Sequence, residues 1–216
     1  MNLEQAHFNM IEQQVRPARV LDTEVLDLLA IIRREDFVPP ALRHLAYAGT
    51  EIPLGHGAYM FSPELEARAL QALAMRKHER VLEIGAGSGY MAALLGAHAD
   101  HVWSFEIEPE LANLARTNLQ RTWVSNVEVI TGDGLQGLLS YAPFDAIMIS
   151  GAVAEVPQAL LEQLKQGGRL FAITGALPAM QATLIRRTGD GLERTALFET
   201  EVDFLRGAAP QPSFTF

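Results

Sequence analysis

The stretch Val81-Leu82-Glu83-Ile84-Gly85-Ala86-Gly87-Ser88-Gly89-Tyr90 decides the fold of this chain of 216 residues. Its apolar start, which contains Val and Ile, predicts a buried strand, and its three alternate glycines then lead into an Ala- and Leu-rich helix over 91–96. Glycines lack a Cβ, so a ligand can approach the backbone closely, and free N–H groups at a helix start favour a negative group. We therefore expect a strand, a ligand-binding loop and a helix.

The spacing of the glycines distinguishes between classes of binding loop. A dinucleotide fingerprint needs Gly or Ala at the sixth position of G-x-G-x-x-G, and counting from Gly85 that position is Tyr90, which disfavours NAD. The Gly-Lys-Ser/Thr of a phosphate loop is absent, and a nucleophile elbow would need Ser where Gly87 stands. G-x-G-x-G with Glu83 just before it instead resembles the loop of S-adenosylmethionine (SAM) methyltransferases.

The next strand supplies the partner that a nucleoside cofactor requires. Residues 101–105 predict this strand, which ends at Glu106, 21 positions after Gly85. An acid about 20 residues after the first glycine can accept hydrogen bonds from both ribose hydroxyls of an adenosine. A helical stretch over 109–120 follows. Glu106 is therefore the predicted ribose ligand.

Two later strands end at residues suited to the same site. The third strand, over 127–130, is followed by Asp133-Gly134, which we expect near the adenine. The fourth, over 144–149, ends at Ser150-Gly151, over the crevice where ligands bind in open parallel sheets. Each acid alone is more often a solvated loop residue or a helix cap. Features at three successive strand ends nevertheless favour a single cofactor site.

The composition predicts one compact enzyme domain. Hydrophobic residues make up 49% of the chain and charged residues 20%, which is ordinary for a globular protein. There is no Cys, and the six His form no ligand pair such as H-E-x-x-H. We therefore expect neither disulfides nor a metal site.

Charge and hydropathy disfavour two classes of partner. The net charge of −9 and the pI near 5.1 oppose binding to a polyanion, because affinity for nucleic acid depends on neutralising phosphates. No apolar run approaches the roughly 20 residues needed to span a bilayer, and the start of the chain lacks a basic n-region. We expect a cytoplasmic enzyme without a nucleic-acid or membrane partner.

The N-terminal third predicts helices followed by an irregular apolar loop. Pro17 ends a first helix, and Asp22 caps a second one. The loop over 50–63 carries Gly and Pro but is too apolar for a simple solvent-facing linker. Ser62 as N-cap, with Pro directly after it, opens a further helix that extends to about Met75.

The C-terminal third is expected to complete the sheet. A helix over 156–165 is stopped by two glycines, and a fifth strand covers 169–174. Two late strands, over 182–188 and 192–205, are joined by a Gly-Asp-Gly turn and pair antiparallel. The tail over 207–216 has no clear assignment.

Short motifs spread over nearly the full chain follow the pattern of one enzyme family. They are Met10-Ile11-Glu12-Gln13-Gln14, 34–39, 53–57, 80–90, 132–134, 142–147, 163–164 and 167–168. Through these motifs the chain resembles the protein-L-isoaspartate O-methyltransferases. The resemblance implies a Rossmann-like α/β fold with seven strands, mostly parallel, and helices on both faces. It also implies one methyltransferase domain, with a helical N-terminal extension and substrate loop over 1–62 and a SAM-binding core over 63–216.

The resemblance also assigns residues to the cofactor. It places the glycine loop, the ribose acid and the adenine-side residues on SAM, and it implies that Gln181 helps to close the cofactor site. The expected cofactor residues are Glu83, Gly85, Ala86, Gly87, Ser88, Gly89, Glu106, Ile107, Asp133, Gly134, Ser150 and Gln181.

The substrate loop departs from the family pattern Gly-Gln-Thr-Ile-Ser-x-Pro. Phe61 stands where the family has its active-site Ser, Tyr59 replaces the Thr, and Met91 replaces a Gln after the glycine motif. A phenyl ring cannot hydrogen-bond a substrate carboxylate, and such a charge-assisted bond contributes roughly 1.5 to 3 kcal/mol. Ser62 is the candidate catalytic substitute, with helix capping as its alternative role, and Phe61 alternatively belongs to the core.

The acceptor is expected between the substrate loop and the end of the fourth strand. The residues concerned are Ala58, Tyr59, Met60, Ser62, Gly151 and Ala152. A carboxylate acceptor is already ionised near pH 7 and needs no general base. The family implies methylation of the free carboxylate of isoaspartyl residues in damaged proteins. Alternatives are a less polar acceptor, a SAM-binding protein without catalysis and, last, an NAD oxidoreductase. The oligomeric state stays open.

Overall fold

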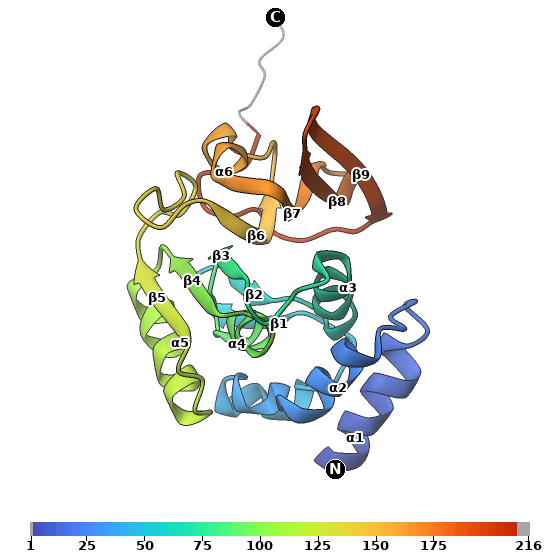
Figure 1. The fold of residues 1–216 in the computed structure, drawn as a ribbon. Coiled ribbons are helices and arrows are strands. Elements are labelled where there is room, and N and C mark those ends of the chain that lie inside the picture. The colour runs from blue at the N-terminus through green and yellow to red at the C-terminus, as the bar shows by residue number, and fades with distance from the viewer. Residues whose placement is uncertain (1, 211–216) are drawn as a thin grey trace, which may run out of the picture.

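A seven-stranded sheet forms the centre of the computed structural model, which describes residues 2–210 (Figure 1). Its strands are β3 (Arg80–Ile84), β4 (His101–Glu106), β5 (Val127–Thr131), β6 (Phe144–Val153), β7 (Leu164–Ala176), β8 (Ala179–Thr188) and β9 (Gly191–Glu199). They lie in the order β5-β4-β3-β6-β7-β8-β9, parallel from β5 to β7 and antiparallel for β8 and β9. The direction of winding reverses between β3 and β6, where a ligand crevice opens in sheets of this kind.

Helices cover both faces because the strand residues alternate between two apolar clusters. On β3, Val81 belongs to one cluster, whereas Leu82 and Ile84 belong to the other. The first cluster packs against α3, α4 and α5, and the second against α6. The helices are α1 (Leu3–Met10), α2 (Thr23–Ile31), α3 (Pro63–Leu73), α4 (Tyr90–Ala97), α5 (Pro109–Arg121) and α6 (Gln158–Glu162), with a π-helical turn at Ile11–Val15 and 3₁₀ turns at Arg34–Asp36 and Pro40–Leu45. The predicted mostly parallel α/β fold is confirmed.

The N-terminal helices join the same apolar core as the sheet. The Asp22 side chain accepts the N–H of Glu24 at 2.9 Å, which confirms it as the cap of α2. Helix α2 contacts α3 and α4 (Figure 1). The first helix continues past Met10 as the π-helical turn, so its end before Pro17 agrees with the prediction.

The loop over 50–63 is more ordered than expected. It contains an antiparallel hairpin of β1 (Ile52–Gly55) and β2 (Ala58–Met60). His56 and Gly57 form the turn at φ of 55° and 75°, the left-handed region that sharp turns require. The prediction of an irregular segment was wrong because Gly and Pro in this stretch serve a turn and an edge strand.

The fourth strand does not end at Ile149. Strand β6 continues to Val153 through an irregularity in its pairing with β7, between the pairs Met148↔Phe171 and Ala152↔Ile173. A bulge of this kind redirects side chains and is frequent beside active sites. Ser150 lies within this irregular part of the strand, at the crevice.

Two further boundaries in the C-terminal third were wrong. Helix α6 covers only Gln158–Glu162, and the two glycines expected to stop it lie within β7, which begins at Leu164. Strand β9 ends at Glu199, whereas a strand was expected to continue to residue 205.

Residues 200–206, called the return segment below, cross back to β6. The Leu205 N–H donates to the Ala152 carbonyl and the Ala152 N–H to the Asp203 carbonyl, both at 2.9 Å. A Cβ on Gly151 would lie 2.5 Å from Leu205 Cδ2, so a larger residue there would require the Leu205 side chain to move. Residues 202–206 of the return segment form a wall of the crevice.

No helix within residues 2–210 is long and apolar enough to cross a membrane.

Candidate functional site

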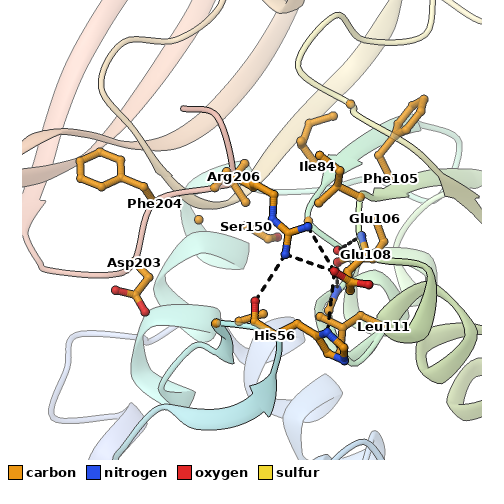
Figure 2. A pocket seen from close by; sticks show the side chains of 18 of the residues that line it. His56, Ile84, Phe105, Glu106, Glu108, Leu111, Ser150, Asp203, Phe204 and Arg206 are labelled. Atoms are coloured by element: carbon orange, nitrogen blue, oxygen red, sulfur yellow. Dashed lines mark hydrogen bonds and ion pairs between the residues drawn. The ribbon is translucent and has the colours of Figure 1, made fainter. Parts of the chain in front are cut away.

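A cavity of about 310 Å³ opens at the carboxyl ends of the central parallel strands (Figure 2). Its walls come from the β1–β2 hairpin, the glycine loop after β3, the segments after β4 and β5, the bulge of β6 and the return segment. The lining residues are Glu51, His56, Gly57, Ala58, Tyr59, Phe61, Ile84, Gly85, Gly87, Phe105, Glu106, Ile107, Glu108, Leu111, Gly132, Asp133, Gly134, Leu135, Ser150, Gly151, Val202, Asp203, Phe204, Leu205 and Arg206. This brings together most of the residues expected from sequence.

The glycine loop is held in shape by its own hydrogen bonds. Gly85 and Ala86 both donate to the Phe105 carbonyl, at 2.8 and 2.9 Å, and Gly87 donates to Glu106 Oε2 at 2.8 Å. The expectation of N–H groups left free for a negative ligand is therefore wrong for these three. Gly85 lines the cavity, and a Cβ there would lie 3.1 Å from Leu205 Cδ2 and 3.2 Å from the Ser150 carbonyl oxygen, so the close packing of the loop favours glycine at this position.

Three loop residues do not line the main cavity. A Cβ on Gly89 would lie 3.2 Å from the Ala115 backbone, so this glycine serves the packing of α4 on α5. Ala86 and Ser88 are buried and face a smaller cavity of about 30 Å³ behind the loop, which Met91 also lines. Their expected contact with a cofactor is not supported by this placement.

Glu106 is buried and lines the cavity. Besides Gly87, it accepts the N–H of Glu108 at 3.0 Å, so both carboxylate oxygens are fixed. Asp133 accepts the N–H of Leu135 at 2.9 Å. A Cβ on Gly134 would lie 2.6 Å from Phe105 Cβ, so that position needs glycine. Ile107 also lines the cavity.

Glu83 lies beneath the cavity floor and is not among its lining residues. It is fully buried and accepts hydrogen bonds from Ser104 Oγ at 2.5 Å and Ser150 Oγ at 2.9 Å. Burial raises the pKa of Glu83 from its ordinary value of 4.5 to about 7. Its contribution is to orient Ser150, which does line the cavity.

The raised pKa makes the stability of the chain depend on Glu83 and on pH. A carboxyl group whose pKa is higher in the folded state stabilises the fold below pH 4.5, and this contribution is lost as pH rises through about 7. The free energy of unfolding of Glu83→Gln, relative to the parent, should therefore rise by about 3 kcal/mol between pH 5 and pH 8. Urea unfolding at both pH values measures it. The exposed acid Glu128, replaced by Gln, provides the control, and a pH-independent difference would contradict the expectation.

Gln181, which was expected to help to close the cofactor site, is not among the residues that line the cavity. It lies on β8 with an exposed side chain, paired with Thr174 and Glu199 in the antiparallel part of the sheet. In the sheet, β7 lies between β6 and β8, so Gln181 is not on a strand next to the crevice. The return segment lines the cavity where Gln181 was expected to do so. No sequence pattern indicates that residues 200–206 turn back toward β6.

The acceptor residues divide into two groups. Ala58, Tyr59 and Gly151 line the cavity as expected. Met60 and Ala152 are buried and do not. Met60 faces the smaller cavity, and Ala152 is held in the backbone pairing between β6, β7 and the return segment.

Ser62 is not a cavity residue, whereas Phe61 is. The Ser62 hydroxyl accepts the N–H of Leu65 at 3.4 Å and caps α3, so the tentative catalytic role for it is not supported. Phe61 is 7% exposed, contributes to the apolar core and is among the residues that line both cavities. No hydroxyl stands at the expected position.

A buried arginine fixes the backbone at Phe61. Arg34, which is fully buried, donates to the Phe61 carbonyl at 2.5 Å and forms an ion pair with Glu66 on α3. Its guanidinium also lies 5.3 Å from the centre of the Tyr90 ring. Burial raises the pKa of Glu66 to about 7, although Arg34 acts against this shift. The N-terminal extension therefore holds the substrate loop.

A charged group at the cavity was not predicted from sequence. Arg206 Nη1 and Nη2 lie 3.1 and 3.2 Å from Glu108 Oε2, and Nη2 donates to the His56 carbonyl at 3.5 Å (Figure 2). The ligand atoms of His56, Glu108 and Glu110 lie within 4.8 Å of one another, with the positive charge of Arg206 beside them. The sequence signal that could have pointed to this cluster is the charged Arg206 directly after Phe204 and Leu205.

Similarity to known proteins agrees with this geometry. The family described as protein-L-isoaspartate(D-aspartate) O-methyltransferase (PCMT) matches residues 5–205. Protein-L-isoaspartate O-methyltransferases of Koribacter versatilis and Methanoculleus marisnigri are each 42% identical, covering 87% and 83% of this chain and 85% and 82% of their own. A solved protein-L-isoaspartate O-methyltransferase from Plasmodium falciparum, in complex with S-adenosyl-L-homocysteine, has the same fold at 20% identity, with a TM-score of 0.79 over 92% of this chain and 97% of that one.

Proposed function

The chain belongs to the protein-L-isoaspartate(D-aspartate) O-methyltransferase family, and on this premise we propose that it transfers a methyl group from SAM to the free carboxylate of isoaspartyl residues in damaged proteins. The observation that carries the proposal is the meeting of Glu106, the glycine loop and the β1–β2 hairpin around one cavity. One side of that cavity suits a nucleoside, and the other faces the substrate loop.

The residues present fit SAM or its demethylated product. The fixed carboxylate of Glu106 is available to the ribose hydroxyls, and Ile107, Asp133 and Gly134 would surround the adenine. The methionine end would rest on Gly85, where a Cβ would meet the Ser150 carbonyl and Leu205. The cavity of about 310 Å³ is in the range of small-molecule sites.

In the proposed reaction the side chains mainly position the acceptor and exclude water. SAM supplies a methyl group that is already activated. The chain has to hold an acceptor oxygen in line with that methyl group and to exclude water, which the Tyr59 and Phe61 rings and the return segment would do. An isoaspartyl carboxylate is ionised near pH 7, so no general base is required.

We also propose the domain organisation, the class of acceptor and the cellular location of the enzyme. Residues 1–62 and 63–216 would act as one methyltransferase domain, consistent with a core cluster that contains residues of both parts. The net charge of −9 supports a protein or peptide acceptor rather than nucleic acid. A cytoplasmic location fits this acceptor and the lack of Cys.

The direct test is methyl-ester formation on an isoaspartyl peptide. The purified chain, with SAM and saturating peptide, should methylate the isoaspartyl peptide and leave the same peptide with a normal aspartyl linkage unmodified. Absence of ester at saturating peptide and SAM, with S-adenosylhomocysteine still bound in calorimetry, would reject the proposed acceptor and leave the cofactor assignment intact.

A second candidate is methylation of a less polar acceptor by the same site. The observation that favours it is the pair of aromatic residues Tyr59 and Phe61 in the cavity wall, where the family resemblance implies a hydroxyl. Retained cofactor binding without isoaspartyl turnover would favour this candidate, and a failure to methylate any acceptor would favour a binding protein without catalysis.

Phe61→Ser separates these candidates. Restoring a hydroxyl should raise kcat/KM for the isoaspartyl peptide by about tenfold, because a hydrogen bond to a charged group contributes roughly 1.5 to 3 kcal/mol. The loss of a buried ring should lower the free energy of unfolding by about 3 kcal/mol. Steady-state kinetics and urea unfolding measure the two effects. Phe61→Leu is the matched control, since it keeps an apolar side chain, and an equal gain in kcat/KM with Leu would contradict the role of the hydroxyl.

A further inference from the structure

The cavity is rich in carboxylates, which is unfavourable for an anionic acceptor. Glu51, Glu106, Glu108, Asp133 and Asp203 all line it. Burial is the main cause of the raised pKa of Glu51, and the negative charges of Asp203 and Glu201 raise it further. An acceptor carboxylate that enters this field needs a positive partner, because like charges repel strongly where water is partly excluded.

Arg206 is the one Arg or Lys among the described residues that line the cavity. Figure 2 shows its guanidinium between Glu108 and the backbone of His56, facing the cavity interior. A guanidinium has five N–H donors. Within residues 2–210 its Nη atoms contact Glu108 and His56, whereas Nε has no hydrogen-bond partner, and the side chain is 55% exposed. Donors therefore remain for a second carboxylate.

We infer that Arg206 is a specificity-determining residue that binds the carboxylate of the acceptor, in place of the hydroxyl that Phe61 does not supply. This inference rests on the proposed function. Glu108 holds the guanidinium at the cavity edge, and the Arg206 N–H groups donate to one oxygen of the acceptor carboxylate. The other oxygen stays free to receive the methyl group. No proton is transferred, so the pairing does not interfere with the reaction.

The test compares binding of two peptides in the presence of saturating S-adenosylhomocysteine. One carries an isoaspartyl residue, and the other carries isoasparagine, in which a neutral carboxamide replaces the carboxylate. The full chain should bind the isoaspartyl peptide at least about tenfold more tightly, as expected for a charge-assisted hydrogen bond. Arg206→Gln should bring the two dissociation constants together, and Arg206→Lys should retain part of the difference. Arg16→Gln, which alters an exposed ion pair with Glu12, is the matched control and should keep the full preference.

The outcomes separate this inference from the alternatives. A parent chain that binds both peptides equally, or Arg206→Gln with an unchanged preference, overturns it. An Arg206→Gln variant that loses only affinity for S-adenosylhomocysteine also overturns it, because Arg206 would then act on the cofactor. If the preference depends on Arg206 but the parent forms no methyl ester, the carboxylate site stands and the proposed reaction fails. Both peptides are measured by calorimetry, with thermal unfolding of each variant to confirm that it is folded.

Discussion

Replacing Glu106 with Ala is expected to weaken binding of S-adenosylhomocysteine by about 100-fold, since two hydrogen bonds to a charged acceptor are lost. Both Glu106 oxygens are held by backbone N–H groups, those of Gly87 and Glu108, so the carboxylate is fixed before any ligand arrives. A preorganised acceptor of this kind loses little entropy on binding. Isothermal calorimetry with the demethylated product measures the change.

Two controls make the Glu106 result specific. Glu106→Gln keeps the shape and one acceptor oxygen, so its loss of affinity should be smaller than that of Ala. Glu128→Gln alters an exposed acid on the neighbouring strand β5 and should bind as the parent does. An Ala variant that binds the product as tightly as the parent would show that the sugar does not lie on Glu106.

Replacing Arg34 with Ala should lower the free energy of unfolding by about 3 to 5 kcal/mol, because it leaves the buried Glu66 carboxyl without its ion-pair partner. Burial raises the pKa of Glu66 to about 7 while Arg34 acts to lower it, so removing Arg34 should raise this pKa further. The protonated carboxyl stabilises the fold at low pH, and the variant loses more of this contribution than the parent as pH rises through 7. The loss in the variant should therefore be larger at pH 8 than at pH 5. Urea unfolding at the two pH values checks both statements.

The matched variant for Arg34 removes both charges together. Arg34→Met combined with Glu66→Met should recover most of the stability, because replacing a buried ion pair by apolar groups is often nearly neutral. The double variant still lacks the donor to the Phe61 carbonyl. A double variant as unstable as Arg34→Ala would mean that the ion pair is not the cause.

The sequence predicted that the glycine loop and the segments after β4 and β5 meet at one cavity, because these positions follow from local rules. Glu106 was found by its distance along the chain from Gly85, and Asp133-Gly134 by its position after a strand. Parallel strands bring their carboxyl ends to one edge, so these residues meet without any knowledge of packing. Ser62 as a helix cap could also be expected from sequence, since Ser followed by Pro is a local signal.

The place of the return segment at the cavity could not be predicted because it depends on contacts between distant segments. The position of Arg206 beside Glu108 results from the return segment, and the clearance that Gly151 gives to Leu205 is visible only in three dimensions. Gln181 was misplaced for the same reason. Glu83 was assigned to the ligand, although its hydrogen bonds to two serines show that it supports the cavity from beneath.

The return segment also sets the order in which the binding site can be assembled during synthesis. The glycine loop and the Glu106 strand emerge from the ribosome about a hundred residues before Val202 to Arg206, which form one wall of the cavity. A nascent chain that has released only the first strands exposes an open groove. Enclosure of a ligand therefore has to wait until the last part of the chain has been made.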